Sequence, residues 1–131
     1  MRVGDEVPVL VRAIGAADMV AYAGATWDWH RLHYDHDWLT ERGLAAPVVD
    51  GQLFGALLVE AVQDWLGPAA TVRRLSMRFV APVFAGETVR CTGRVTGVDG
   101  PLVTVEQRIE VAGERARLVV APAGCTVERR R

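Results

Sequence analysis

The chain of 131 residues carries 15 basic and 16 acidic side chains and is 50% hydrophobic, a balance typical of one folded domain over residues 1–131 rather than of a disordered chain. Its formal charge of −1 argues against nucleic acid as a partner, because such binding requires a strongly basic surface. Apart from histidine, every basic residue is arginine, and the absence of lysine excludes Schiff-base enzymes, phosphate-loop nucleotide hydrolases and catalytic Ser/Lys pairs.

The first half of the chain has the spacing of helices. A short strand over residues 7–11 is predicted to lead into a helix over residues 16–23, which Gly24 can end because glycine accepts left-handed backbone. A loop follows over residues 28–34, and Asp35 can cap a short helix after it. The longest helix is predicted next, from about Gln52 to Leu66, and it ends at Gly67 and Pro68. Its polar residues fall within about a third of its circumference, so the predicted helix is surrounded by other apolar surface.

The second half of the chain has the alternation of strands. Leu75, Met77 and Phe79 alternate with polar residues, which predicts a strand over residues 74–79 with one buried face. The same period predicts strands over residues 89–95 and 103–111, and a last strand passes through Leu118 and Val120. Short turns between consecutive strands predict antiparallel pairing. The predicted fold is therefore α+β, a curved antiparallel sheet wrapped around one long central helix, followed by a solvated tail over residues 129–131.

Cysteine usage and hydropathy predict a cytoplasmic protein. Cys91 and Cys125 are far apart, and neither lies in a paired metal-ligand or redox spacing, which indicates a reduced environment. The chain begins without an apolar signal segment, and no uninterrupted apolar run approaches the roughly 18 residues that a membrane span requires.

The segment over residues 28–37 contains all three histidines and is the first place to look for chemistry. Histidine exchanges protons near neutral pH, and an aspartate five residues away can complete an acid/base pair; Asp28 and His33 are the candidates. The alternatives are a solvated structural cluster, with His36 most often structural, and a metal site made of His30, His33, Asp35 and His36. We expect no metal, because these histidines would spread around a helix and no second cluster of ligands is present.

The stretch Thr26-Trp27-Asp28-Trp29-His30-Arg31-Leu32-His33 resembles the signature G-D-x-N-P-x-H of MaoC-like hot-dog proteins, the (R)-specific enoyl-CoA hydratases and 3-hydroxyacyl-thioester dehydratases. Val48-Val49-Asp50-Gly51 falls where this family has an apolar pair and His-Gly at the start of its central helix. Residues 64–67, 78–83 and 86–89 also match, so the resemblance covers nearly the whole chain.

The resemblance implies a hot-dog fold and a lyase that adds water to a trans-2-enoyl thioester of CoA or acyl carrier protein, or removes it from a 3-hydroxyacyl thioester, in fatty acid metabolism and without a cofactor. It implies that Asp28 and His33 hold one water and that the backbone amide of Gly51 binds the thioester oxygen. The candidates for substrate binding are Trp27, Trp29, His30, Tyr34 and Asp50. Aromatic residues with this spacing are more often part of a core.

Three departures from the signature change what can be carried over. Trp27 replaces the glycine before the aspartate, and His30-Arg31 replaces Asn-Pro, as in mesaconyl-CoA hydratase-like members. Asp50 replaces the histidine before Gly51. This carboxylate would oppose a developing enolate if it pointed inward while ionised, and it would be harmless if it pointed outward and capped the helix.

A single hot-dog sheet leaves long edges and an uncovered face, so a homodimer or higher oligomer is expected, and a heteromer is the alternative. In a heteromer, for example of the steroid-CoA type, this chain would have little activity alone; a hot-dog thioesterase is a further alternative. Without lysine, the phosphates of CoA would be bound by arginines such as Arg73, Arg74 or Arg129. Neither nucleic acid nor a membrane is expected as a partner.

Overall fold

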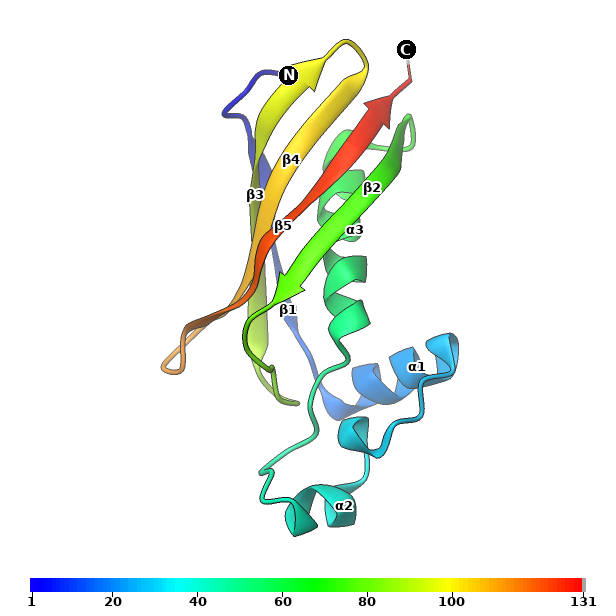
Figure 1. The fold of residues 1–131 in the computed structure, drawn as a ribbon, viewed down its shortest axis with the longest axis vertical. Helices are drawn as coiled ribbons and strands as arrows, with labels where there is room; N and C mark the ends of the chain where they lie inside the picture. Colours follow the sequence, from blue (N-terminus) through cyan, green and yellow to red (C-terminus); the bar gives the residue numbers. More distant parts are fainter. Residues whose placement is uncertain (131) are drawn as a thin grey trace.

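The computed structural model describes residues 1–130, and Figure 1 shows a curved sheet that wraps around one long helix. Neighbouring strands are all antiparallel, in the order β1-β3-β4-β5-β2. This confirms the predicted α+β fold. The strands are β1 (Glu6–Ala13), β2 (Ala70–Phe79), β3 (Thr88–Asp99), β4 (Leu102–Val111) and β5 (Arg117–Arg129). The helices are α1 (Ala16–Thr26), the short 3₁₀ helix η1 (Arg31–His33), α2 (His36–Glu41) and α3 (Gly51–Leu66).

The core lies between α3 and the concave face of the sheet. Leu58 and Val62 of α3 are fully buried, and so are alternate residues of β4 and β5, such as Val103 and Val127. The two-residue period of the strands thus places their apolar side chains against the apolar side of the helix, as the sequence predicts. No helix within residues 1–130 combines the length and the apolar character that crossing a membrane requires.

One polar side chain crosses this core and ties the sheet to the helix. Gln107 of β4 is only 3% exposed, and its Nε2 donates a hydrogen bond to the Leu58 carbonyl oxygen over 3.0 Å. Gly93 makes room for it, because a Cβ at that position would lie 2.9 Å from the Gln107 Cγ. A buried amide is tolerated here because it has an acceptor.

Several predicted boundaries are wrong. Helix α1 does not end at Gly24 but continues to Thr26, with Trp27 as its left-handed C-cap. Helix α3 begins at Gly51, one residue earlier than predicted. Strand β5 extends to Arg129, so this arginine belongs to the sheet and not to a tail; Arg131 lies outside the described residues.

The predicted buried face of β2 is also wrong in part. Leu75 and Phe79 are exposed, although both lie on the side that the alternation assigns to the core. Leu75 does approach Gly55 of α3, but β2 is the last strand of the sheet. No element within residues 1–130 lies beyond that edge, so the helix covers these side chains only from one side.

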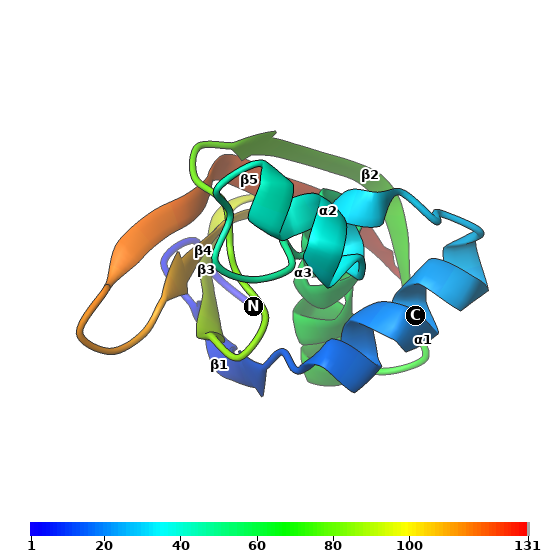
Figure 2. The ribbon, with the colours of Figure 1, turned by 90° about the horizontal axis from the view of Figure 1, so that it is seen from below.

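Helices α1 and α2 lie beyond one end of the sheet, and both termini of the chain lie toward the opposite end (Figure 1). Seen from below, α1 and α2 pass across the N-terminal end of α3 (Figure 2). The connection from α2 to α3 therefore returns the chain to the place where η1 and the end of α1 also lie. This arrangement brings residues 28–33 and residue 50 together.

Candidate functional site

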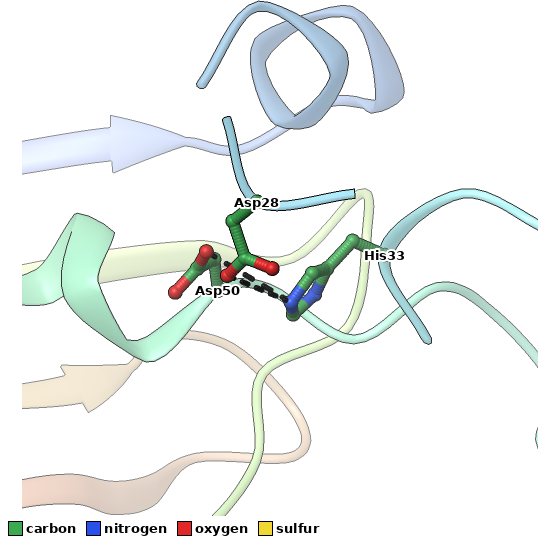
Figure 3. Close-up of side chains that lie close together, drawn as sticks. All are labelled: Asp28, His33 and Asp50. Atoms are coloured by element: carbon green, nitrogen blue, oxygen red, sulfur yellow. Dashed lines mark ion pairs between the residues drawn. The ribbon is translucent and has the colours of Figure 1, made fainter. Parts of the chain in front are cut away.

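Three side chains converge where α1, η1 and α3 meet. Asp28 follows α1, His33 ends η1, and Asp50 immediately precedes α3, and Figure 3 shows the three side chains pointing toward one another. The His33 Nε2 lies 3.8 Å from Asp28 Oδ2 and also 3.8 Å from Asp50 Oδ2. The structure thus brings Asp28 and His33 together, as the sequence predicts, and adds Asp50 as a third member.

The position of Asp28 follows from an abrupt end to α1. Trp27 has a left-handed backbone with φ of +57°, and the next amide, of Asp28, donates to the Ala23 carbonyl oxygen over 3.0 Å. This turn reverses the chain and directs Asp28 back toward the start of α3. The Asp28 Oδ1 also accepts a long hydrogen bond of 3.4 Å from the His30 amide, which begins the turn into η1.

The orientation of His33 is fixed by a backbone carbonyl. Its Nδ1 lies 2.6 Å from the carbonyl oxygen of Val48, and the amide of Val48 in turn donates to the Leu32 carbonyl oxygen over 3.0 Å. Because a carbonyl oxygen only accepts, Nδ1 must carry the proton of this bond. In the neutral ring the Nε2 is then an acceptor, and it is the atom that faces the two carboxyl groups.

Asp50 caps α3, as one alternative predicts, but it points into the site and not outward, so the orientation expected with the cap is wrong. Its Oδ1 accepts a hydrogen bond from the Gln52 amide over 3.0 Å, the usual contact of an N-cap. Its Oδ2 is buried and has no hydrogen-bond partner among the described residues. Only 13% of the side chain is exposed, so water replaces little of the missing contact.

The two carboxyl groups shift each other's protonation in opposite directions. The neighbouring carboxyl group of Asp50 lowers the pKa of Asp28, while burial, and then the contact with Asp28, raise the pKa of Asp50. Ligand atoms of the two carboxyl groups lie within 4.8 Å of each other, and two carboxyl groups that close do not both ionise readily. Tyr22 of α1 responds to the same charge, since burial first, and then Asp50 and Asp28, raise its pKa.

Gly51 presents its amide at the start of α3. As the first helical residue it has no acceptor within the helix for its N–H group, and the helix dipole favours negative charge at this end. The ring of Phe79 covers its Cα, because a Cβ on Gly51 would lie 2.8 Å from the Phe79 Cζ. The close approach of that ring favours glycine here, a contact that the sequence does not reveal.

The candidate binding residues surround the site unequally. Trp27, Trp29 and Tyr34 are exposed and meet in edge-to-face contacts, 5.8 Å between the two tryptophan rings and 6.2 Å between Trp29 and Tyr34. They are therefore not part of the core, which is the alternative for aromatic residues with this spacing. His30 has a structural contact, since its Nδ1 accepts from the Leu32 amide over 3.0 Å and its ring packs on Trp38.

A groove of about 590 Å³ runs beside this cluster between α3 and β2. Tyr22 and Gln52 line the end nearest Asp50, and small residues of α3 form its floor. No pattern in the sequence indicates Tyr22, because it lies on an ordinary surface helix. The residues that line the groove are Tyr22, Gln52, Gly55, Ala56, Val59, Glu60, Gln63, Asp64, Leu75 and Met77.

The histidines do not form the metal site that is the alternative interpretation of the sequence. Within residues 1–130, the one group of potential ligands dense enough to share an ion is Asp28, His33 and Asp50, whose ligand atoms lie within 4.8 Å of one another. The arginines considered for phosphate binding differ in availability, since Arg73 is engaged with Glu128 over 2.6 Å, while Arg74 is exposed beside a shallow pocket on the outer face of the sheet.

Comparison with known sequences places these residues in a family. Residues 2–115 match the family described as MaoC like domain. The beta subunit of the 3-oxo-4,17-pregnadiene-20-carboxyl-CoA hydratase of Mycobacterium tuberculosis is 32% identical over 104 residues, which cover 79% of this chain and 81% of that protein. An (R)-specific enoyl-CoA hydratase of Aeromonas caviae is 30% identical over 107 residues, which cover 79% of this chain and 80% of the relative.

Solved structures share the fold over its whole length. A chain of the ChsH1-ChsH2 complex from Mycobacterium tuberculosis superposes with a TM-score of 0.88 at 28% identity, covering 98% of both chains. The (R)-hydratase from A. caviae involved in PHA biosynthesis gives a TM-score of 0.87 at 26% identity, covering 99% of this chain and 98% of the other. The sheet wrapped around a helix is therefore common to this chain and to both of these structures.

Proposed function

This chain belongs to the MaoC-like domain family, and from that membership we propose that it adds water to a trans-2-enoyl thioester to give a 3-hydroxyacyl thioester, or catalyses the reverse dehydration. Relatives at about 30% identity are hydratases of CoA thioesters, which supports activity in this general class. The observation that carries the proposal is the convergence of Asp28 and the acceptor nitrogen of His33 beside the first amide of α3.

The separation of the two groups suits a bound water. A distance of 3.8 Å between His33 Nε2 and Asp28 Oδ2 is too long for a direct hydrogen bond, and one water can accept this geometry by donating to both atoms. In such a position the water oxygen is held by two acceptors, and its lone pairs are directed away from them. It is thereby oriented to attack a substrate carbon on its open side.

We propose the following course for the reaction. The water oxygen bonds to the β-carbon while one of its protons passes to His33 Nε2, and the π electrons of the enoyl group move toward the thioester oxygen. The amide of Gly51 donates a hydrogen bond to that oxygen as it gains charge. The imidazolium of His33 then gives its proton to the α-carbon, which restores the neutral ring and completes the addition of one water. Asp28 accepts the second O–H of the water and stays ionised throughout.

The acyl group is assigned to the groove between α3 and β2. The groove begins at Tyr22 and Gln52, next to the cluster, and Gly55 and Ala56 leave its floor free of bulky side chains. Its far end carries Asp64, whose negative charge would repel the phosphates of CoA, and Glu60, which is paired with Arg12 over 2.6 Å. The thioester would therefore enter with its acyl part toward the groove and its CoA or carrier part toward the exposed aromatic residues.

We expect the chain to act as an oligomer. β1 and β2 are both open edges of the sheet, and exposed apolar residues such as Leu75 and Phe79 lie along β2 beside the groove. A second hot-dog subunit would cover them. A heteromeric hydratase is the second candidate, because one relative is a beta subunit and a similar chain comes from a ChsH1-ChsH2 complex.

The test is a hydration assay on the purified chain with short, medium and bulky trans-2-enoyl-CoA substrates, following loss of the conjugated-thioester absorbance and then the stereochemistry of the product. Release of free thiol is measured in parallel to detect thioesterase activity, and a chelator is included to test for a metal. We expect hydration that survives chelation. No hydration by the chain alone, with activity appearing only when a partner subunit is added, would favour the heteromer.

The roles of the pair are tested by Asp28→Asn and His33→Ala. Each variant should lower kcat/KM by at least about 100-fold, the low end of what a positioned acid or base contributes. Asp37→Asn and His36→Ala are matched controls, since they change the same residue types at exposed positions of α2 and should keep activity. Retained activity in either member of the pair, with a folded protein, would refute its role.

A further inference from the structure

One carboxyl oxygen of Asp50 caps α3, whereas the other has no role in the cap. Oδ1 accepts from the Gln52 amide, but Oδ2 is buried and unpartnered and lies 3.8 Å from His33 Nε2. A buried carboxylate oxygen without a donor is unusual, because burial removes the water that would otherwise stabilise its charge. The same oxygen would be satisfied if it carried a proton.

No arginine is among the described groups that act on Asp50. Tyr22 faces it from α1 and Asp28 from the turn after α1, and neither supplies positive charge. His33 approaches from η1 with its Nε2, but its proton lies on Nδ1 and is used by the Val48 carbonyl oxygen. From α3 itself Asp50 receives only the Gln52 amide. A protonated Oδ2 would find an acceptor at once in the carboxylate of Asp28.

We propose that Asp50 is a positioning residue that works as the neutral acid, with its Oδ2–H donating to the Asp28 carboxylate while its Oδ1 caps α3. This inference rests on the proposed hydration and names a further residue for it. The proton would hold Asp28 in the orientation that receives the water. It would also leave no negative charge next to the Gly51 amide, where the thioester oxygen gains charge. The raised pKa of Asp50 and the lowered pKa of Asp28 point in the same direction.

Substitutions separate this role from capping alone. Asp50→Asn keeps an oxygen for the cap and places an NH₂ donor where the acid had its O–H, so it should retain kcat within about threefold. Asp50→Ser also caps a helix well, but its hydroxyl cannot serve the cap and Asp28 together. We expect Asp50→Ser to lose about 10-fold or more in kcat, because a misplaced Asp28 misdirects the water. Equal activity of the Ser and Asn variants would overturn the proposal.

The pH dependence of kcat provides a readout that a cap would not change. In the wild type, raising the pH through the pKa of Asp50 removes the shared proton, so activity should fall on that side of the profile. The amide of Asp50→Asn cannot ionise, and that fall should disappear. Tyr22→Phe, which alters the other titrating neighbour, should keep it. If the profile of Asp50→Asn coincides with the wild type, Asp50 does not act through its proton.

A second measurement needs no substrate and therefore stands even if the proposed hydration fails. The pKa of Asp50 is higher in the folded protein than in the unfolded chain, so the stability it contributes is present below the unfolded value and is lost as pH rises through the folded value. As pH rises from the unfolded to the folded pKa value of Asp50, the free energy of unfolding of Asp50→Asn should therefore increase relative to that of the wild type. Asp37→Asn serves as the exposed control. A constant difference between Asp50→Asn and wild type at all pH values would show that no proton is held.

Discussion

The contact between Gly51 and Phe79 makes Gly51→Ala the most informative single substitution. The added methyl would lie 2.8 Å from Cζ and 3.0 Å from Cε1 of the ring, so one of them has to move. Overpacking of this kind costs about 1–3 kcal/mol, and alanine in place of glycine returns at most about 1 kcal/mol of helix propensity. Phe79 is 51% exposed and can swing outward, so the lower end of the cost applies. Because the two effects partly offset each other, we expect a net loss of at most about 1 kcal/mol, or at most roughly 3–5 °C in Tm.

The effect on catalysis should be larger than the effect on stability. A displacement of the Gly51 amide by even a fraction of an ångström weakens the hydrogen bond to the thioester oxygen, and a shift of about 1 Å is enough for a 100-fold loss. We therefore expect kcat/KM to fall at least about 10-fold in a protein that stays folded. The assays are enoyl-CoA hydration and thermal unfolding of the same preparation.

Phe79→Leu and the double variant Gly51→Ala/Phe79→Leu complete a double-mutant cycle, which measures the effect of the contact between the added methyl and the ring. If the ring is the cause, the combined variant should recover most of the activity and stability that Gly51→Ala loses, and the two substitutions should be strongly non-additive. Purely additive effects would place the origin of the loss elsewhere in the helix start. Unchanged activity in Gly51→Ala would contradict the assignment of this amide to the thioester oxygen.

Two further predictions concern Trp27, in the turn after α1, and the ion pair between Arg117 and Glu87. Trp27 is 79% exposed and holds a left-handed backbone, a conformation that costs a non-glycine residue about 1–2 kcal/mol. Trp27→Gly should therefore raise the free energy of unfolding by up to about 1 kcal/mol, and it should also raise KM. An unchanged KM would show that Trp27 is not part of the binding surface. Arg117 donates to both carboxylate oxygens of Glu87 and, by this bond first, lowers the pKa of Glu87. The stability from this pair is present above the unfolded pKa of Glu87 and is lost as pH falls through the folded value. In urea unfolding, the free energies of unfolding of wild type and Arg117→Ala should therefore differ by about 1–2 kcal/mol at pH 7, and this difference should narrow toward pH 3. A difference that stays constant with pH would contradict the pairing.

The strands of the sheet could be predicted because their alternation has a single physical cause. Val89 and Val105 are buried since a period of two places every second side chain on the face that meets α3. The same rule fails for Leu75 and Phe79, because alternation indicates which side a residue faces and not what covers that side. β2 is an edge strand, and no element within the described residues lies beyond it. Edge position depends on strand order, which local sequence does not contain.

The proximity of Asp28 and His33 is predictable for a similar reason, and the wider surroundings of the two residues are not. Asp28 and His33 are close in sequence, so a short turn is sufficient to bring them together. Tyr22 and Phe79 approach the same place from α1 and from the end of β2, and only the folded arrangement of α1, α3 and β2 shows this. The predicted end of α1 at Gly24 is wrong because it assumes the usual role of glycine, whereas Trp27 takes the left-handed position instead.

For Asp50 the two alternatives, cap or inward-facing acid, are not independent. A carboxyl group is planar and carries two oxygens, so a hydrogen bond from Gln52 to Oδ1 fixes the plane and with it the direction of Oδ2. At the start of α3 that direction is toward Asp28 and His33, because the turn after α1 and the Val48 carbonyl have already placed those side chains there. Capping therefore imposes the inward orientation, and burial of the second oxygen then favours its proton. If the proposal holds, a residue that a helix start would select for its cap is also a hydrogen-bond donor to the carboxylate of Asp28.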